Sequence, residues 1–291
     1  MGYSDSLPQM SEKERSGHMG TDTNKQVGFL GAGAIAEVFV RRLLGCGLIS
    51  ADRIFAYDTK EAILVRLASS LGVRAAASNR EVVGDSAIVF IAVPPMAVVP
   101  VLREAAAEFR KDHMVFSLAA GVPIAQMEAA IGKPVPVIRT IPNTPAWIGQ
   151  GMTPFCVGSH VGSAEREEAI ALLQSFGRIA EIPEEQMAIA TALTAVGPTY
   201  LFPVIAALAD AAVAHGLPPG IALTAACQVV AGAGQLVLES KRSPEALSLL
   251  TSLRTLDEPT AKKLFTQAVE DAFGKVLAAE AKLRSSSNTG S

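Results

Sequence analysis

The sequence predicts an α/β fold, in which an N-terminal Rossmann-type doubly wound parallel sheet is followed by an all-α C-terminal dimerisation domain. Strand-like apolar runs alternate with helical patterns over residues 24–182, as in a sheet whose parallel strands are joined by crossover helices. A glycine-rich turn, Gly31–Ala36, directly follows the first of these runs. Beyond residue 183 no convincing strand pattern is found, and Ala, Leu and Val recur at helical spacing.

The composition permits two domains and excludes some partners. The chain has 291 residues, of which 49% are hydrophobic, so two ordinary domains with sizeable apolar cores are possible. The formal net charge is −3, and the Lys and Arg residues form no basic block. Because proteins that bind polyanions normally cluster their cations, we expect no nucleic-acid partner and no anionic membrane partner.

The cysteines and the apolar runs favour a cytoplasmic protein. Cys46, Cys156 and Cys227 are odd in number and far apart, so the sequence predicts neither a disulfide framework nor a metal site. Each is expected to be a small buried hydrophobe, which suits a reducing compartment. Glycine, proline or charge interrupts the apolar runs before about 18 residues, so no transmembrane helix is expected. The polar N-terminal stretch lacks the apolar core of a secretory signal.

We divide the chain into four segments. Residues 1–23 are expected to be a flexible N-terminal extension or tag, 24–182 the dinucleotide-binding domain, 183–285 the helical substrate and dimerisation domain, and 286–291 a flexible tail. An ordinary helical bundle would also explain the third segment. However, helices this rich in small apolar residues do not easily bury themselves in one chain, and obligate interfaces resemble cut cores. We therefore favour dimerisation.

The glycine-rich turn predicts dinucleotide binding. It lies between a predicted strand at residues 26–31 and a predicted helix at 34–46, the first βα unit of a Rossmann fold. In such a turn, backbone N–H groups and a helix N-terminus can contact the pyrophosphate. The G-x-G-x-x-A match is weak alone and depends on its context. The predicted cofactor-binding residues of this turn are Gly31, Ala32, Gly33, Ala34, Ile35 and Ala36.

Asp58 has two possible roles. It ends the predicted strand at residues 54–58, where a Rossmann fold places the carboxylate that binds the adenosine ribose. It could equally be a helix N-cap, and the sequence leaves both possibilities open. As a ribose ligand, Asp58 would favour NADH by repelling a 2′-phosphate, whereas Thr59 and Lys60 could bind that phosphate. The choice between NADPH and NADH therefore stays open.

Two later strands end in segments suited to the nicotinamide half of a cofactor. Residues 88–93 are apolar and largely β-branched, as in a central parallel strand, and Pro94-Pro95 stop the run. Residues 114–118 are followed by Ala119-Ala120-Gly121, which are small enough to let a ligand approach the backbone. In parallel sheets the ligand lies at the carboxyl ends of the strands, where both segments are expected.

Three stretches together resemble the pyrroline-5-carboxylate reductase family over residues 26–283. Val27–Ala36 is similar to its cofactor loop, Ile138–Ala146 to its R-x-M-P-N-T-P-A signature, and Leu193–Tyr200 to the S-G-S-G-P-A-Y segment that opens its helical domain. The resemblance implies hydride transfer from NADPH or NADH to a cyclic imine, 1-pyrroline-5-carboxylate, to give proline. It also implies a homodimer or a higher homo-oligomer.

The resemblance further implies site residues. Asn143 and Thr144 would lie at the junction of cofactor and substrate, and Gly197 and Pro198 would contact the substrate. Trp147 could form a wall of the site, although packing in the core is the favoured expectation. The residues that would line the nicotinamide ribose and ring are Ala92, Val93, Pro94, Pro95, Ala119, Ala120 and Gly121.

The chain departs from the family where the substrate loop is expected. The family sequence S-P-G-G-[TA]-T is replaced within Ser252–Thr260, which lacks the glycines. Asp257 or Glu258 could stabilise an iminium ion or donate a proton if burial raised its pKa, or could simply begin a helix. Arg254, beside Thr255, could bind a substrate carboxylate through two hydrogen bonds or form a surface salt bridge.

Two other functions remain open. A dehydrogenase of a β-hydroxy acid or another carbonyl compound would usually need a lysine or histidine in the helical domain, and no well-placed candidate is found. His215 is expected to cap a helix end, and His113 to lie in a surface turn. The missing glycine-rich loop would also suit a nucleotide-binding regulatory protein that has lost catalysis.

Overall fold

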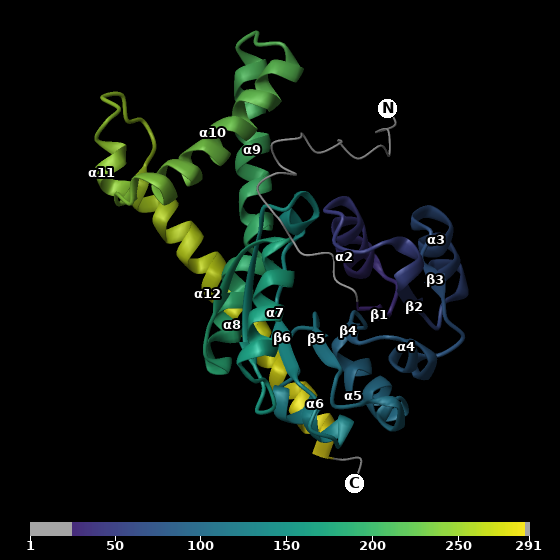
Figure 1. Ribbon diagram of the computed structural model, residues 1–291. Helices are drawn as coiled ribbons and strands as arrows, with labels where there is room; N and C mark the ends of the chain where they lie inside the picture. Colours follow the sequence, from purple (N-terminus) through teal and green to yellow (C-terminus); the bar gives the residue numbers. More distant parts are fainter. Residues whose placement is uncertain (1–24, 289–291) are drawn as a thin grey trace. The chain divides into compact units, whose positions relative to one another are not determined.

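The structure, a computed structural model, describes residues 25–288 (Figure 1). Its contacts divide these residues into two units. The sheet unit comprises the described residues up to Ala195 together with those from Phe273 onward, and the helical unit comprises Val196–Ala272. The predicted N-terminal extension lies outside the described residues. Helix α12 (Glu258–Asn288) continues past residue 285, where the predicted tail begins.

The described part of the sheet unit contains one eight-stranded sheet in the order β3-β2-β1-β4-β5-β6-β7-β8. Figure 1 shows the part of this order from β3 to β6. The predicted Rossmann-type fold is confirmed. The strands are β1 (Val27–Leu30), β2 (Ile54–Tyr57), β3 (Arg74–Ala75), β4 (Ile88–Ile91), β5 (Met114–Ser117), β6 (Val137–Thr140), β7 (Gly151–Val157) and β8 (Gly177–Glu181).

The sheet departs from a wholly parallel arrangement at one pair. Strand β7 runs antiparallel to β6, and the other neighbouring strands are parallel. The connection between β6 and β7 holds only the short 3₁₀ turn η3 (Thr144–Ile148) and no crossover helix. A parallel pair needs a connection of about a dozen residues or more, so this short loop reverses the chain direction.

Helices cover both faces of the sheet. Helices α2 (Ala34–Gly45), α3 (Glu61–Leu71) and α7 (Ser163–Gln174) bury apolar side chains against one face. The other face packs against a second set of elements, together with Leu283 near the end of α12. That second set is α4 (Asn79–Asp85), α5 (Pro95–Glu104), α6 (Ile124–Ile131) and α8 (Met187–Ala190).

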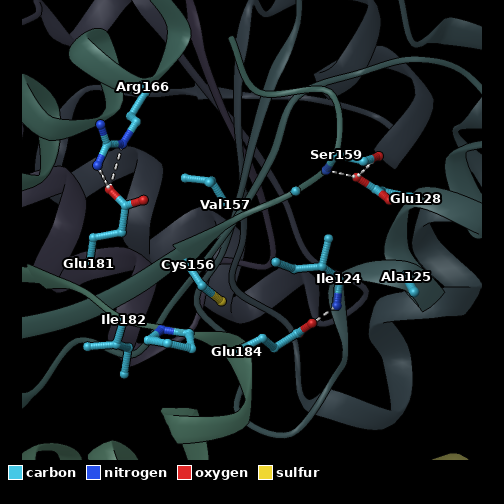
Figure 2. A pocket seen from close by; sticks show the side chains of 12 residues that line it. Ile124, Ala125, Glu128, Cys156, Val157, Ser159, Arg166, Glu181, Ile182 and Glu184 are labelled. Carbon is cyan, nitrogen blue, oxygen red and sulfur yellow. Dashed lines mark hydrogen bonds and ion pairs between the residues drawn. The ribbon is translucent and has the colours of Figure 1, made fainter. Parts of the chain in front are cut away.

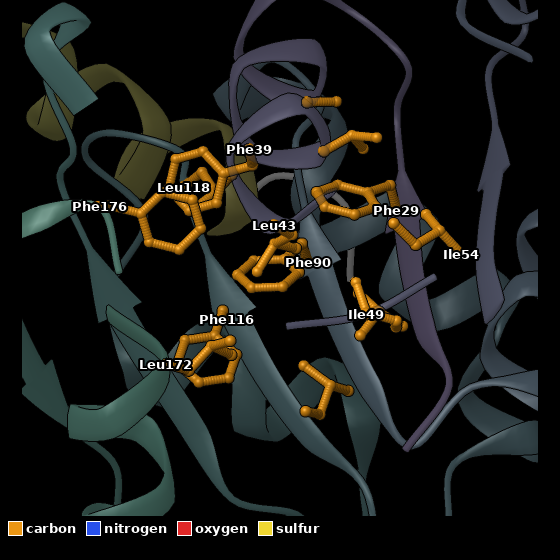
Figure 3. Close-up of a cluster of buried hydrophobic side chains, with 14 of the residues drawn as sticks. Phe29, Phe39, Leu43, Ile49, Ile54, Phe90, Phe116, Leu118, Leu172 and Phe176 are labelled. Atoms are coloured by element: carbon orange, nitrogen blue, oxygen red, sulfur yellow. The ribbon is translucent and has the colours of Figure 1, made fainter. Parts of the chain in front are cut away.

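A row of aromatic rings fixes the register of the central strands (Figure 3). Phe29, Phe90 and Phe116 are register partners on β1, β4 and β5, and neighbouring ring centroids lie 5.0 Å apart. Phe39 of α2 packs edge-on against Phe90 and stacks on Phe176. Side chains alternate between the two faces along a strand, so the three rings lie on the same face. The same register places the carboxyl ends of β1, β4 and β5 side by side.

The helical unit has a small core. Helices α9 (Gly197–Ala214) and α10 (Pro219–Ser240) are followed by α11 (Pro244–Ser248) and the first part of α12. The residues buried between α9 and α10 are Ala209, Ala222 and Ala226. Many large apolar side chains of this unit are exposed, among them Leu201, Phe202, Leu208, Val229, Leu236 and Leu264.

Two helical stretches bear on the expectation that the chain has no transmembrane helix. Residues Glu184–Ala214 and Pro219–Ser240 are long and apolar enough to span a membrane by length and composition, although such a match alone is weak evidence for a span. Glycine and proline do occur inside these helices, since Pro203 lies within α9 and both Gly232 and Gly234 lie within α10.

Candidate functional site

The glycine turn lies where the order of the strands reverses. The chain passes from β1 outward to β2 and β3, and then returns to place β4 on the other side of β1. Leu30, Ile91 and Ser117, the last residues of β1, β4 and β5, are aligned by their register. In open α/β sheets, ligands bind in the crevice outside the carboxyl ends of the strands at this reversal.

Gly31 is required by the close packing of the turn. Its φ is +101°, which favours glycine, and a Cβ at this position would lie 2.8 Å from the carbonyl oxygen of Ala92. Its N–H donates to the carbonyl of Tyr57 at 2.8 Å. The turn is therefore held between the ends of β2 and β4.

Gly33 leaves open space in front of helix α2. It is the N-cap residue of this helix, and within the described chain only its sequence neighbours and the local helix backbone come within 4 Å of the position that a Cβ would take. The first N–H groups of a helix have no partner within the helix, and they lie at the positive end of its dipole. The open cradle and these donors fit the pyrophosphate of a dinucleotide.

Asp58 holds the glycine turn in place. Its Oδ2 accepts a hydrogen bond from the Ala32 N–H at 2.9 Å, and its Oδ1 accepts one from the Lys60 N–H at 2.9 Å. Helix α3 has Lys60 at its N-cap, so the N-cap role that the sequence allowed for Asp58 is wrong. The ribose-binding role stays a prediction.

The predicted nicotinamide wall lies at the same edge of the sheet. The Ala92 N–H donates to the Leu30 carbonyl at 2.8 Å, so the segment Ala92–Pro95 begins directly beside the glycine turn. Pro94 caps helix α5, and Pro95 begins it. The segment Ala119–Gly121 follows β5, the next strand along the edge. The structure therefore brings both predicted segments to the edge that carries Gly31–Ala36.

Asn143 ties three segments together. Its Oδ1 accepts from the Met152 N–H at 3.0 Å, and its Nδ2 donates to the Thr194 carbonyl at 3.1 Å. Thr194 belongs to the π-helical turn η5 (Thr191–Ala195), a rare conformation that is frequent at functional sites. Thr144, at the start of η3, is exposed. Trp147 is 50% exposed, so the expectation that it packs in the core is wrong.

Arg139 is a buried cation. It belongs to the motif Ile138–Ala146, but no functional role was predicted for it from the sequence. It lies on β6 with 2% of its surface exposed and forms ion pairs with Glu184 at 3.0 Å and Glu280 at 2.7 Å. The signal in the sequence was a charged residue inside the apolar run Val135–Ile141. Its partners lie 45 and 141 residues further along the chain, so sequence patterns did not identify them.

Asp257 and Glu258, the predicted catalytic acids, are exposed in the helical unit. Asp257 Oδ1 accepts from the Thr260 N–H at 3.2 Å, and Oδ2 accepts from the Thr260 hydroxyl at 2.6 Å. These hydrogen bonds lower the pKa of Asp257, so the raised pKa required of a proton donor is absent. The contacts favour the helix-start role at this residue. Arg254 pairs with Glu258 in an exposed i,i+4 contact.

Thr255 is exposed in the same loop. Gly197 and Pro198 begin helix α9, and beyond the local backbone no described atom lies within 4 Å of a Cβ at Gly197. The substrate roles of these residues stay predictions.

A separate pocket of about 640 Å³ is lined by residues at the ends of β7 and β8 and by the first turns of α6 (Figure 2). Its charged groups are satisfied locally, because Arg166 pairs with Glu181 at 2.6 Å and Glu128 accepts hydrogen bonds from Ser159. Cys156 lines it, and burial raises the pKa of this thiol to about 12, so it is protonated at neutral pH. None of the predicted cofactor residues lines this pocket.

The expectation that all three cysteines are buried is confirmed only for Cys156. Cys46 is partly exposed, and Cys227, on α10, is exposed. His113, expected in a surface turn, has 1% of its surface exposed.

Two family models match the chain. Residues 184–286 match the model described as pyrroline-5-carboxylate reductase dimerisation, and residues 26–121 match the model described as NADP oxidoreductase coenzyme F420-dependent. The chain is 31% identical over 255 residues to a pyrroline-5-carboxylate reductase of Methanosarcina acetivorans, covering 84% of this chain and 94% of that protein. It is 31% identical over 271 residues to the Escherichia coli pyrroline-5-carboxylate reductase, covering 90% and 99%.

Solved structures of pyrroline carboxylate reductases also resemble this chain. The Plasmodium falciparum pyrroline carboxylate reductase with NADP bound superposes with a TM-score of 0.76 at 25% identity, covering 88% of this chain and 98% of that chain. A pyrroline-5-carboxylate reductase from Coxiella burnetii superposes with a TM-score of 0.71 at 27% identity, covering 90% and 98%.

Proposed function

The chain belongs to the pyrroline-5-carboxylate reductase family, and we propose that it reduces 1-pyrroline-5-carboxylate to proline with a hydride from NADPH or NADH. The observation that carries this proposal is the open cradle at Gly33, in front of an uncapped helix N-terminus at the reversal of the sheet. Two relatives that the chain matches over 94% and 99% of their lengths are both described as pyrroline-5-carboxylate reductase.

The residues of the sheet edge bind and orient the cofactor. The N–H groups at the start of α2 would hold the pyrophosphate, and Asp58 keeps the turn in position by binding Ala32. The small residues Ala119–Gly121 would let the nicotinamide approach the backbone. When bound, the cofactor supplies the hydride, while the protein supplies proximity and orientation.

The substrate side is proposed from the resemblance and from the contacts of Asn143. Both functional groups of the Asn143 amide bind backbone groups, so this residue shapes the loop that carries Thr144. The resemblance further assigns substrate contacts in the helical unit to Gly197 and Pro198 and to the segment of residues 252–258. In the latter segment Arg254 and Thr255 are the proposed contacts, and Asp257 has the role of a helix cap.

The helical unit supports assembly as a homodimer or a larger homo-oligomer, which we propose works in the cytoplasm. It buries only small residues between α9 and α10 and exposes large apolar side chains along both helices. Apolar patches of this extent mark interaction sites, and the segment matches a family model described as a dimerisation domain. A second copy of the chain would bury them.

The proposal is tested by following the absorbance of reduced nicotinamide with each cofactor and a panel of cyclic imines. We expect oxidation of NADPH or NADH with 1-pyrroline-5-carboxylate and formation of proline. Binding of either cofactor, seen as a change in the fluorescence of the exposed Trp147, without turnover of any imine would contradict the enzymatic proposal. That result would instead favour a nucleotide-binding regulatory protein.

A further inference from the structure

The Arg139 cluster, consisting of Arg139, Glu184 and Glu280, joins distant segments of the sheet unit. Arg139 Nη1 donates to Glu184 Oε1 at 3.0 Å, and Nη2 donates to Glu280 Oε1 at 2.7 Å. Glu280, on α12, is 8% exposed. A buried charge is costly unless it is paired, so each carboxylate is needed to compensate the guanidinium.

The cluster contacts the loop between β5 and α6, residues 118–123, from two sides. Glu184 Oε1 also accepts from the Ile124 N–H at 2.8 Å, directly after the loop. Gly121, with φ +80°, packs against α12 so closely that a Cβ there would lie 3.2 Å from Glu280 Cγ and 3.1 Å from Leu283 Cδ1. The loop is therefore fixed at its middle by α12 and at its end by Glu184.

We propose that Glu280, through Arg139, is a positioning residue that holds the loop 118–123 in the conformation needed for the nicotinamide half of the cofactor. This inference rests on the proposed function, because Ala119–Gly121 form the wall to which that half is assigned. Arg139 is 2% exposed and both of its terminal nitrogens are paired, so it links Glu280 to Glu184, which in turn accepts from the Ile124 N–H, and is not available for the substrate carboxylate.

The variants Glu280→Ala and Glu280→Gln test the inference, with Glu270→Gln as the matched control on an exposed position of the same helix. Hydrogen exchange of the peptide covering residues 118–124 reads the loop directly. We expect Glu280→Ala to raise exchange there about tenfold and Glu280→Gln, which keeps one acceptor, to raise it less. The Glu270→Gln variant should match the wild type.

Ligand binding provides a readout that general destabilisation would not give. We expect Glu280→Ala to weaken NADPH about tenfold, while 2′-phospho-ADP-ribose, which lacks the nicotinamide, binds within about twofold of wild type. With the imine, kcat should fall about tenfold with little change in KM. If Glu280→Ala does not fold, Glu280→Gln is compared with the wild type in the same assays.

Unchanged exchange of residues 118–124, or equal weakening of NADPH and its fragment, would overturn the inference. A wild-type protein that binds the cofactor but reduces no imine would refute the proposed function, and the exchange and affinity comparisons would still decide the role of Glu280. If neither ligand binds, the exchange measurement alone decides it.

Discussion

Asp58 Oδ2 accepts a hydrogen bond from the Ala32 N–H at 2.9 Å, so the carboxylate at the end of β2 fixes the glycine turn at the end of β1. Its other oxygen accepts from the Lys60 N–H at the same distance. A carboxylate offers acceptors only, and both donors depend on it. Asp58 is thus part of the scaffold of the turn, whichever cofactor binds.

Replacing Asp58 by Asn should weaken both cofactors similarly. The amide has one acceptor oxygen, so its NH₂ group would face one of the two backbone N–H groups. We expect the Kd of NADH and of NADPH to rise about tenfold each, the effect of losing one charge-assisted hydrogen bond. Titrations followed by Trp147 fluorescence measure both. A loss confined to NADH would instead indicate a contact with the ribose 2′-hydroxyl.

Gly33→Val should abolish nucleotide binding and leave the fold intact. A Cβ at this position meets no atom within 4 Å apart from its chain neighbours and the local helix backbone, so we expect the side chain to fill the cradle without a clash. Calorimetry should give a wild-type Tm, and equilibrium dialysis should detect no NADPH binding. Gly84→Val on α4, equally free of neighbours, is the control that keeps binding.

The variant Gly31→Val distinguishes the structural role of Gly31 from the binding role proposed for Gly33. Here a Cβ would lie 2.8 Å from the Ala92 carbonyl oxygen at φ +101°, so we expect lost stability as well as lost binding. A Gly31→Val protein with wild-type Tm would show that the turn adopts another conformation.

His113 should make the protein less stable in mild acid. Burial, and to a smaller extent the positive charge of Arg110, lowers the pKa of His113 from 6.5 to about 4. The Nδ1 atom of His113 accepts a hydrogen bond from the Arg110 N–H at 3.1 Å. The unfolded chain therefore binds the proton first as the pH falls. The contribution of this group to stability is complete above pH 6.5 and declines toward pH 4.

Urea unfolding at neutral pH and at about pH 5 measures this effect. We expect the loss linked to His113 to be about 2 kcal/mol over that interval. His113→Gln, which cannot titrate in this range, should lose that much less stability between the two conditions. An unaltered pH dependence in the variant would assign the acid sensitivity to other groups.

Val229→Glu should disrupt assembly. Val229 is 63% exposed on α10, and a carboxylate at this position would have to be desolvated when a second copy covers the helix. Sedimentation should show monomers at concentrations where the wild type associates. Gln228→Glu adds the same charge at a neighbouring exposed polar position and should leave assembly unchanged. A monomeric wild type would contradict the homo-oligomer itself.

The parts of the fold that the sequence predicted are those set by local patterns. Phe29 and Phe90 sit in short apolar runs bounded by glycine, proline or polar residues, and such runs identify strands without knowledge of their neighbours. The antiparallel direction of β7 was missed, because it depends on the length and path of the loop after Thr140. Strand direction is a property of the connection rather than of the strand residues.

The candidate site likewise has one part that the sequence predicts and one part that it does not. The glycine turn has a fixed spacing that the sequence displays, whereas the pairing of Arg139 with Glu280 links positions 141 residues apart. His113 was misjudged for a related reason: its neighbours Lys111 and Asp112 are exposed and polar, but its own ring packs against Phe109. Local polarity does not reveal where a single side chain points.

Because α12 supplies Glu280 and Leu283 to the sheet unit, this unit is built from both ends of the chain. During synthesis, the sheet residues up to Ala195 leave the ribosome long before α12 does. Until then Arg139 lacks one of its two carboxylates, and the apolar surface that Leu283 covers stays open. Co-translational folding of the nucleotide-binding half is therefore completed only after α12 has been translated.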